Sequence, residues 1–311
     1  MSTDVRILEP GQLEAPRGEI RFLFLPDGTI FSRRAERLRL LSNGHPLGDF
    51  LSFLAKLSNA QQEALQQFPR GIIPGPDEQA RCREKGMPLL GAQSLRRDPA
   101  WRSGLKQILQ TVQGPDLPAL AQDALMKLMQ ADEGLLEGTA DCIVSGYLDA
   151  VAPQEMPFVA AALQVYWVRM ASLLKEDAVC RSEQRGLCPV CGSPPSVGIV
   201  RSTGSEQGLR YLSCSLCASQ WHLVRLTCSA CQSTEGIDYY TREGSNSAVK
   251  AESCVKCGSY MKLLYLSKDP HMDPTADDLA TVSLDMLMDE EGRSRRGPNL
   301  YYHPGRVHGH D

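Results

Sequence analysis

Up to about residue 180, apolar positions recur at helical spacing. The clearest face lies between His45 and Phe68 and consists of Leu47, Phe50, Leu51, Leu54, Leu57, Ala64, Leu65 and Phe68. Before it, residues 30–44 read as a second amphipathic helix, which Asn43 and Gly44 would end. Further helices are expected over 101–112, 117–131, 142–148 and 156–174. The pattern predicts an all-α domain over residues 1–180.

Two stretches of this region depart from the amphipathic pattern. Residues 70–100 carry a high density of glycine and proline, which predicts a long functional or packed loop rather than a regular element. Residues 156–174 are apolar enough to be considered as a membrane span, but Gln164 and Arg169 interrupt them. An arginine near the middle of a span is costly in lipid. We therefore expect a core helix that starts at Pro157, and no membrane span.

After residue 180 the helical period gives way to short alternating runs and an internal repeat. Eight cysteines stand here as four CxxC pairs: Cys188, Cys191, Cys214, Cys217, Cys228, Cys231, Cys254 and Cys257. Each of the last four lies forty residues after its counterpart among the first four. A fixed offset of this kind is the signature of a repeated structural unit.

Each unit is expected to fold in the order knuckle, hairpin, knuckle and strand, where a knuckle is the tight turn formed by one CxxC pair. The runs 197–213 and 237–253 each split into two short strands around a Gly/Ser/Asn turn, and 220–226 and 260–266 read as strands. All four knuckles share a serine two places after their second cysteine. In the strand between the units, Trp221 and His222 should face opposite sides.

The cysteine pairs indicate metal binding, because two CxxC turns together complete a tetrahedral shell of four thiolates. The repeat favours a tandem arrangement, with the first two pairs in one site and the last two in the other, over a cross-braced one. Spacing does not separate iron from zinc. A closed shell of four cysteines has no open coordination position, so we expect a structural or electron-transfer role and no catalytic residues.

Composition narrows the classes of function. The chain has 311 residues, 42% hydrophobic and 23% charged, which suits a soluble protein of more than one domain. No secretory signal is visible at its start, so a cytoplasmic location is expected. In a reducing compartment, regular CxxC spacing favours metal over disulfides. Residues 181–268 contain ten Lys/Arg and six Asp/Glu, and two four-thiolate metal sites would cancel that excess, which disfavours nucleic-acid binding.

The end of the chain and the unpaired cysteines carry weaker patterns. Residues 275–292 predict an acidic helix that packs back on the domains, with Thr275 and Asp278 spaced as a capping box. Cys82, Cys142 and Cys180 lack paired spacing and are expected to act as small buried hydrophobes. The histidines of the end of the chain, 303–311, are expected to lie in a flexible tail.

Several of these motifs together resemble the formate dehydrogenase accessory protein FdhE family. They are LSCSLCASQWHLVRLTCSAC, VKAESCVKCGSYMKLLY, ADDLA and GHPLGDFLSFLAKL. The resemblance implies a cytoplasmic maturation factor, or chaperone, that is required for the activity of respiratory formate dehydrogenase and binds its catalytic subunit before export. It also implies rubredoxin-like modules that bind two iron ions, with zinc as the alternative. Ala218 and Gln232 depart from the glycine that often follows the second cysteine of such knuckles.

The resulting hypothesis is an α+β multidomain protein that is not an enzyme. It has an α-helical domain (1–180), a first rubredoxin-like module (181–226), a second (227–268) and a C-terminal helix and tail (269–311). The alternatives are a rubredoxin-like electron carrier and a zinc-ribbon module that binds nucleic acid. The oligomeric state is left open.

Overall fold

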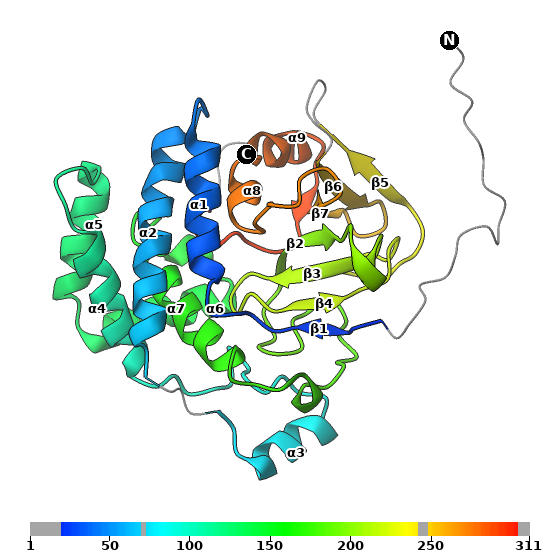
Figure 1. Cartoon of the computed structure of the whole chain (residues 1–311), viewed down its shortest axis with the longest axis horizontal. Helices are drawn as coiled ribbons and strands as arrows, with labels where there is room; N and C mark the ends of the chain where they lie inside the picture. Colours follow the sequence, from blue (N-terminus) through cyan, green and yellow to red (C-terminus); the bar gives the residue numbers. More distant parts are fainter. Residues whose placement is uncertain (1–19, 70–72, 242–247, 304–311) are drawn as a thin grey trace, which may run out of the picture.

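The helical region expected from the sequence is present. The computed structural model describes residues 20–69, 73–241 and 248–303. Six helices form one side of the molecule (Figure 1): α1 (Ile30–Ser42), α2 (Gly48–Gln67), α4 (Ala100–Val112), α5 (Ala119–Gln130), α6 (Glu133–Ser145) and α7 (Met156–Ala171). Short 3-10 turns follow α6 (Leu148–Ala150) and α7 (Glu176–Ala178). The predicted helical character of the N-terminal region is confirmed.

Helix α7 is the centre of this domain. Every residue of α7 except Arg169 is buried, which explains its nearly uninterrupted apolar sequence. The buried amide of Gln164 donates to the carbonyl of Ser215 and accepts from the Tyr301 hydroxyl. In the part of the chain that the structure describes, no helix is both long and apolar enough to cross a membrane. The interpretation of 156–174 as a core helix therefore holds.

The Gly/Pro-rich stretch 70–100 is only partly irregular. The expectation of no regular element is wrong, because helix α3 (Pro76–Glu84) lies within it. Pro76 occupies the first turn, where its missing N–H costs nothing, and Asp77 and Glu78 favour the positive end of the helix dipole. The residues after α3 pack against the first cysteine cluster, so the expectation of a packed loop holds for them.

Strands from both repeats form one sheet. Its order is β1-β4-β3-β2-β7-β6-β5, with β8 added beside β7. The bounds are β1 (Leu23–Phe24), β2 (Pro195–Val200), β3 (Arg210–Cys214), β4 (Gln220–His222), β5 (Ile237–Tyr240), β6 (Val249–Cys254), β7 (Ser259–Tyr265) and β8 (Ser294–Arg295). A 3-10 turn (Gly204–Glu206) lies in the loop of the first hairpin. The tip of the second hairpin, 242–247, lies outside the described residues.

The two repeats follow one another along the sheet. Strands β2, β3 and β4 of the first unit correspond, forty residues on, to β5, β6 and β7 of the second. The units meet where β2 pairs in parallel with β7, Val197 opposite Lys262 and Ile199 opposite Leu264. Every residue of β2 is buried, as expected for a strand covered on both faces. Both predicted hairpins are present as antiparallel pairs.

Strand β1 comes from the helical region and was not expected from the sequence. Leu23 pairs with Trp221 and Phe24 with Gln220, which covers the outer edge of β4. The Tyr211 hydroxyl also donates to the carbonyl of Arg21. The first unit is thereby covered at its edge by residues 21–24.

The expected C-terminal helix is split in two: α8 (Ala276–Leu279) and α9 (Val282–Glu290). The predicted capping box is wrong, because the Thr275 side chain makes no capping bond and Asp273 accepts from the N–H groups of Thr275 and Ala276 instead. Helix α8 is tied to the helical domain through Asp277, whose carboxylate accepts from Arg37 of α1. Its neighbour Asp278 is fully buried and pairs with Lys262 of β7. The helices do pack back on both domains, as expected.

Candidate metal centres

The first centre is built from two knuckles at the ends of the first hairpin. Cys188 and Cys191 precede β2, and Cys214 ends β3 just before Cys217. The Sγ atoms of Cys188 and Cys217 lie 3.5 Å apart, and those of Cys191 and Cys214 lie 3.4 Å apart. All four side chains are buried and belong to the main hydrophobic core.

The second centre repeats this arrangement forty residues later. The Sγ atoms of Cys228 and Cys257 are 3.6 Å apart, and those of Cys231 and Cys254 are 3.7 Å apart. Cys228 and Cys254 are buried, but Cys231 and Cys257 are exposed. The structure thus groups the eight cysteines in the tandem order and not in the cross-braced one.

Both groups fit a tetrahedral metal shell. Within each group all four sulfur atoms lie within 4.8 Å of one another. Metal–sulfur bonds of ~2.3 Å in a tetrahedron would place the sulfurs ~3.8 Å apart, close to the distances found. A disulfide needs sulfurs at ~2.05 Å, so these contacts are not disulfides. The two four-cysteine groups can each hold one divalent ion.

The knuckle backbone points donors at the sulfurs. The N–H groups of Leu216 and Cys217 both lie 3.4 Å from the Cys214 sulfur. The N–H groups of Ala230 and Cys231 lie 3.3 and 3.5 Å from the Cys228 sulfur. Such bonds stabilise the negative charge that a thiolate brings to the shell.

The serine shared by the knuckles has two roles. Its carbonyl accepts the N–H of the first cysteine in the knuckles that begin at Cys188, Cys214 and Cys228, as Ser193 does for Cys188 at 3.0 Å. Its hydroxyl also contacts a sulfur, with Ser219 3.3 Å from Cys217 and Ser259 3.0 Å from Cys257. The repeated serine therefore closes the turn and adds a polar contact to the ligand.

The residue after each second cysteine is in the left-handed region. Gly192 and Gly258 have φ of 78° and 69°, and the non-glycine residues Ala218 and Gln232 adopt 58° and 62°. A Cβ at this conformation costs roughly 1–2 kcal/mol. The two departures from glycine seen in the sequence are thus points of local strain.

The packed thiols ionise unequally. Burial opposes ionisation of Cys191, but hydrogen bonds from the other three thiols and Ser193 hold its pKa well below the usual value. Burial and hydrogen bonds to its neighbours raise the pKa of Cys188 well above it. In the second centre, burial opposes ionisation of Cys257, but hydrogen bonds from Ser259 and the neighbouring thiols lower its pKa to about 6. Metal binding to such sets releases the protons that remain.

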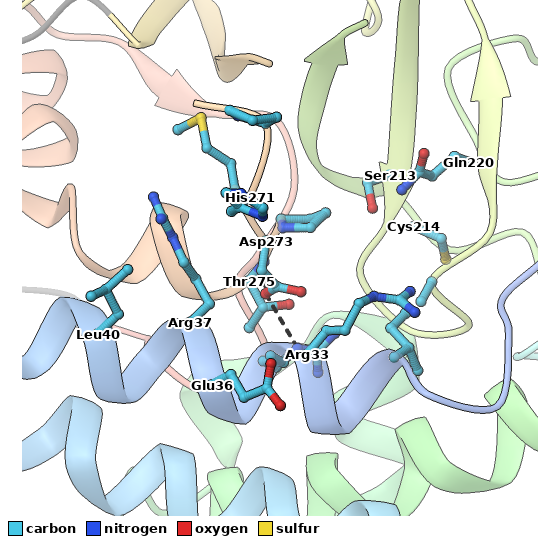
Figure 2. A pocket seen from close by; sticks show the side chains of 16 residues that line it. Arg33, Glu36, Arg37, Leu40, Ser213, Cys214, Gln220, His271, Asp273 and Thr275 are labelled. Atoms are coloured by element: carbon cyan, nitrogen blue, oxygen red, sulfur yellow. Dashed lines mark hydrogen bonds and ion pairs between the residues drawn. The ribbon is translucent and has the colours of Figure 1, made fainter. Parts of the chain in front are cut away.

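A cavity of about 410 Å³ lies beside the first centre, between α1, the 270–275 loop and strands β3 and β4. Figure 2 shows Arg37, His271, Asp273 and Thr275 on one side of it and Ser213, Cys214 and Gln220 on the other. The buried Arg34 lies 3.4 Å from Asp273, and Arg37 pairs with Asp269 and Asp277. The positive charges of these two arginines are therefore largely neutralised. The cavity is a polar gap between the helical domain and the sheet.

The other cysteines and histidines add no further cluster. Cys82 is buried and Cys142 and Cys180 are half-buried, and none of them belongs to a group that could hold a metal ion in the described part of the chain. Trp221 is buried and His222 is half-exposed, as the alternation predicts. The His303 ring lies 2.8 Å from the Asp149 carboxylate, and the rest of the expected tail, 304–311, lies outside the described residues.

Comparison with known proteins gives a consistent picture. Three family models match in succession: FdhE, N-terminal (residues 20–183), FdhE, central domain (187–225) and FdhE, C-terminal domain (226–302). A "Protein FdhE homolog" of Pseudomonas aeruginosa is 42% identical over 304 residues, covering 96% of this chain and 98% of the relative. One from Stutzerimonas stutzeri is 41% identical, with the same coverage. The crystal structure of the FdhE protein from Pseudomonas aeruginosa matches with a TM-score of 0.85 and 41% identity, over 92% of this chain and 100% of that one.

Proposed function

The chain belongs to the FdhE family, and from this membership we propose that it is an accessory factor in the maturation of formate dehydrogenase. In this proposal it binds the catalytic subunit in the cytoplasm before export. The observation that carries the proposal is the match to FdhE over nearly the whole length, which includes both four-cysteine groups. The chemistry of the site agrees with binding better than with catalysis.

A role without catalysis is supported by the ligand sets. Four thiolates fill a tetrahedral shell, so neither ion would keep a position for water or substrate. The cavity beside the first centre is lined by arginines already paired with Asp269, Asp273 and Asp277. We therefore propose that the metal centres give the sheet its shape and that the folded surface contacts the client.

We further propose iron as the native metal, held by Cys188, Cys191, Cys214 and Cys217 in the first centre and by Cys228, Cys231, Cys254 and Cys257 in the second. Zinc is the alternative. Protein purified without oxygen and then oxidised should be coloured by thiolate-to-iron charge transfer and should hold two ions per chain. A colourless protein with two zinc ions would refute the iron assignment.

A strain that lacks this protein tests the function. We expect formate-dependent respiration to be lost while the catalytic subunit is still synthesised. The wild-type chain should restore activity, and a Cys228→Ser/Cys231→Ser variant should not, because ligand loss unfolds a small metal-dependent module. Cys142→Ser is the matched control and should restore it. Normal formate dehydrogenase activity in the deletion strain, or no direct association between the two proteins, would contradict the proposal.

An electron carrier is the second candidate, and the exposure of Cys231 and Cys257 favours it. Exposed sulfurs shorten the path for an electron between the second centre and a docked partner. A reversible redox couple that turns over with a partner protein would support this role. A centre that holds zinc, or an iron centre with no reversible couple, would exclude it.

A further inference from the structure

We propose that the second centre carries a docking surface for a short non-helical segment of a partner protein. This surface, which we term the second knuckle face, consists of Ala230, Cys231, Gln232, Val255, Lys256 and Cys257. In the proposed contact the partner donates alternate backbone N–H groups to the carbonyls of Ala230 and Cys231. The identification of the partner as the unfinished enzyme rests on the function proposed above, but the surface is argued from the two repeats alone.

The first unit shows how such a face is covered. The segment 88–92, which follows α3, lies against the first centre. Its Leu90 N–H donates to the carbonyl of Val190 and its Ala92 N–H to that of Cys191, both at 2.8 Å. Pro88 packs over Gly192, with its Cγ 3.3 Å from the place a Cβ would take. Alternate N–H groups of one segment therefore satisfy two successive carbonyls of the knuckle.

The other knuckle of the first unit, between Cys214 and Cys217, is covered by helix α7. Gln164 donates to the Ser215 carbonyl at 2.8 Å. As a result Val190, Cys191, Ser215, Leu216 and Cys217 are all buried, at 0%, 1%, 8%, 2% and 0% exposure. The helical domain thus shields the first centre from solvent.

The corresponding residues of the second unit, forty positions later, are exposed to solvent. Ala230, Cys231, Val255, Lys256 and Cys257 are all exposed, and Val255 keeps 54% of its surface in solvent. Within 20–69, 73–241 and 248–303, no hydrogen bond reaches the carbonyl of Ala230 or Cys231. The second unit therefore presents the same backbone acceptors as the first, with nothing among the described residues over them.

The chemistry of the face indicates what would cover it. Lys256 pairs with Glu235 at 2.9 Å, so these two side chains add little to the charge of the four-thiolate centre itself, which is of the same kind in both units. The chain that leads into this knuckle also carries two exposed apolar residues, Val224 (56%) and Leu226 (54%). The segment on the first unit, PLLGA, is likewise uncharged and apolar. We therefore assign the face to an uncharged, apolar segment of a partner chain that offers backbone donors.

A peptide copied from this protein provides the probe. A fluorescent peptide of sequence MPLLGAQ, residues 87–93, is titrated against the metal-loaded full chain and followed by anisotropy. We expect saturable binding that Val255→Arg weakens by about fivefold or more. Leu120→Arg, which makes the same change at a residue 73% exposed on α5, should leave binding unchanged.

Two methylated peptides test the backbone contacts directly. N-methylation at the positions of Leu90 and Ala92 removes the two donors and should abolish binding. The same modification at Leu89 and Gly91 removes two other N–H groups and should be tolerated. No saturable binding up to about 1 mM, or equal loss with both methylated peptides, would overturn the proposal.

Other occupants give distinct results. If deletion of residues 1–19 raises the affinity for the peptide by about tenfold, the chain's own start covers the face. If the protein forms a dimer that Val255→Arg dissociates, a second copy does so. Either result overturns the proposal.

The client is tested separately from the face. Association with the formate dehydrogenase catalytic subunit should be lost in Val255→Arg and kept in Leu120→Arg. If Val255→Arg still associates, the surface is wrong and the proposed function stands. If the unmodified chain does not associate, the proposed function is wrong, and the peptide result still decides the surface.

Discussion

Arg210 of the first unit donates to the carboxylate of Glu252 in the second, and the two side chains are 0% and 5% exposed. The same guanidinium donates to the carbonyls of Val224 and Thr227, at 2.7 and 2.6 Å. One buried cation therefore ties the two repeats together and fixes the chain that links them.

Removing the cation should be costly. We expect Arg210→Met to lower the free energy of unfolding by about 3–5 kcal/mol, because Glu252 is left buried without its partner. Urea unfolding of the metal-loaded protein measures this. Lys256→Met breaks an exposed pair, with side chains 57% and 78% exposed, and should cost less than about 1 kcal/mol. Similar losses of unfolding free energy in both variants would show that the buried Arg210–Glu252 pair is no more important than the exposed one.

The two centres should lose their ions at different rates. Cys231 and Cys257 are exposed, whereas all four sulfurs of the first centre are buried, so a chelator reaches the second centre without unfolding the core. We expect two phases of metal release that differ by about tenfold or more. The fast phase should be missing in Cys228→Ser/Cys231→Ser. A single phase for both ions would count against this asymmetry.

Loss of the first centre should lower the thermal stability of the protein more than loss of the second. Its cysteines belong to the main core, so Cys188→Ser/Cys191→Ser should remove one ion and also lower the melting temperature of the helical domain. Cys228→Ser/Cys231→Ser should remove one ion with a smaller shift. Elemental analysis and thermal unfolding measure the two effects. Loss of both ions from either variant would indicate that the centres depend on each other.

The strained knuckle offers a stabilising change. Gln232 has φ of 62°, a conformation that glycine adopts freely. We expect Gln232→Gly to stabilise the loaded protein by about 1 kcal/mol. Gln207, which is exposed with φ of −55°, provides the control. Gln207→Gly should have no effect or be destabilising by up to about 1 kcal/mol.

His222 should make stability depend on pH. Burial, with Arg210 and Arg181 nearby, lowers the pKa of this imidazole below its usual 6.5. As pH falls through 6.5 the unfolded chain takes up the proton first, so the free energy of unfolding should decrease until the folded-state pKa is reached. His222→Gln should remove this part of the pH dependence between about pH 7 and 5. An unchanged profile would show that His222 does not contribute.

The helices, the hairpins and the metal ligands could be predicted from the sequence, because each depends on the spacing of residues that are close together in the chain. The periodicity around Leu51 and Leu54 predicted α2, and the forty-residue offset predicted the grouping of the eight cysteines. Helix α3 was missed because glycine and proline on both sides of it dominated the composition. The left-handed conformations of Ala218 and Gln232 were foreseeable from glycine at the matching positions.

The contacts between distant segments were not predictable. No local pattern says that Val197 pairs with Lys262 in parallel, or that Leu23 adds a strand beside Trp221. The two centres differ in solvent exposure because the segment 88–92 covers only the first, and this segment is far from the cysteines in sequence. Packing between domains determines such contacts, and the cysteine spacing is the same in both repeats.

The place of strand β1 has a consequence for the time course of folding. Arg21 and Tyr211, which are joined by a hydrogen bond, are 190 residues apart in the sequence. At typical synthesis rates of about 5–20 residues per second, the first strand waits roughly 10–40 s before its partner leaves the ribosome. During that interval β1 has no strand to pair with. The earliest of these pairings on a nascent chain is therefore the β2–β3 hairpin, and once β4 has joined it, the much earlier-synthesised strand β1 covers its edge.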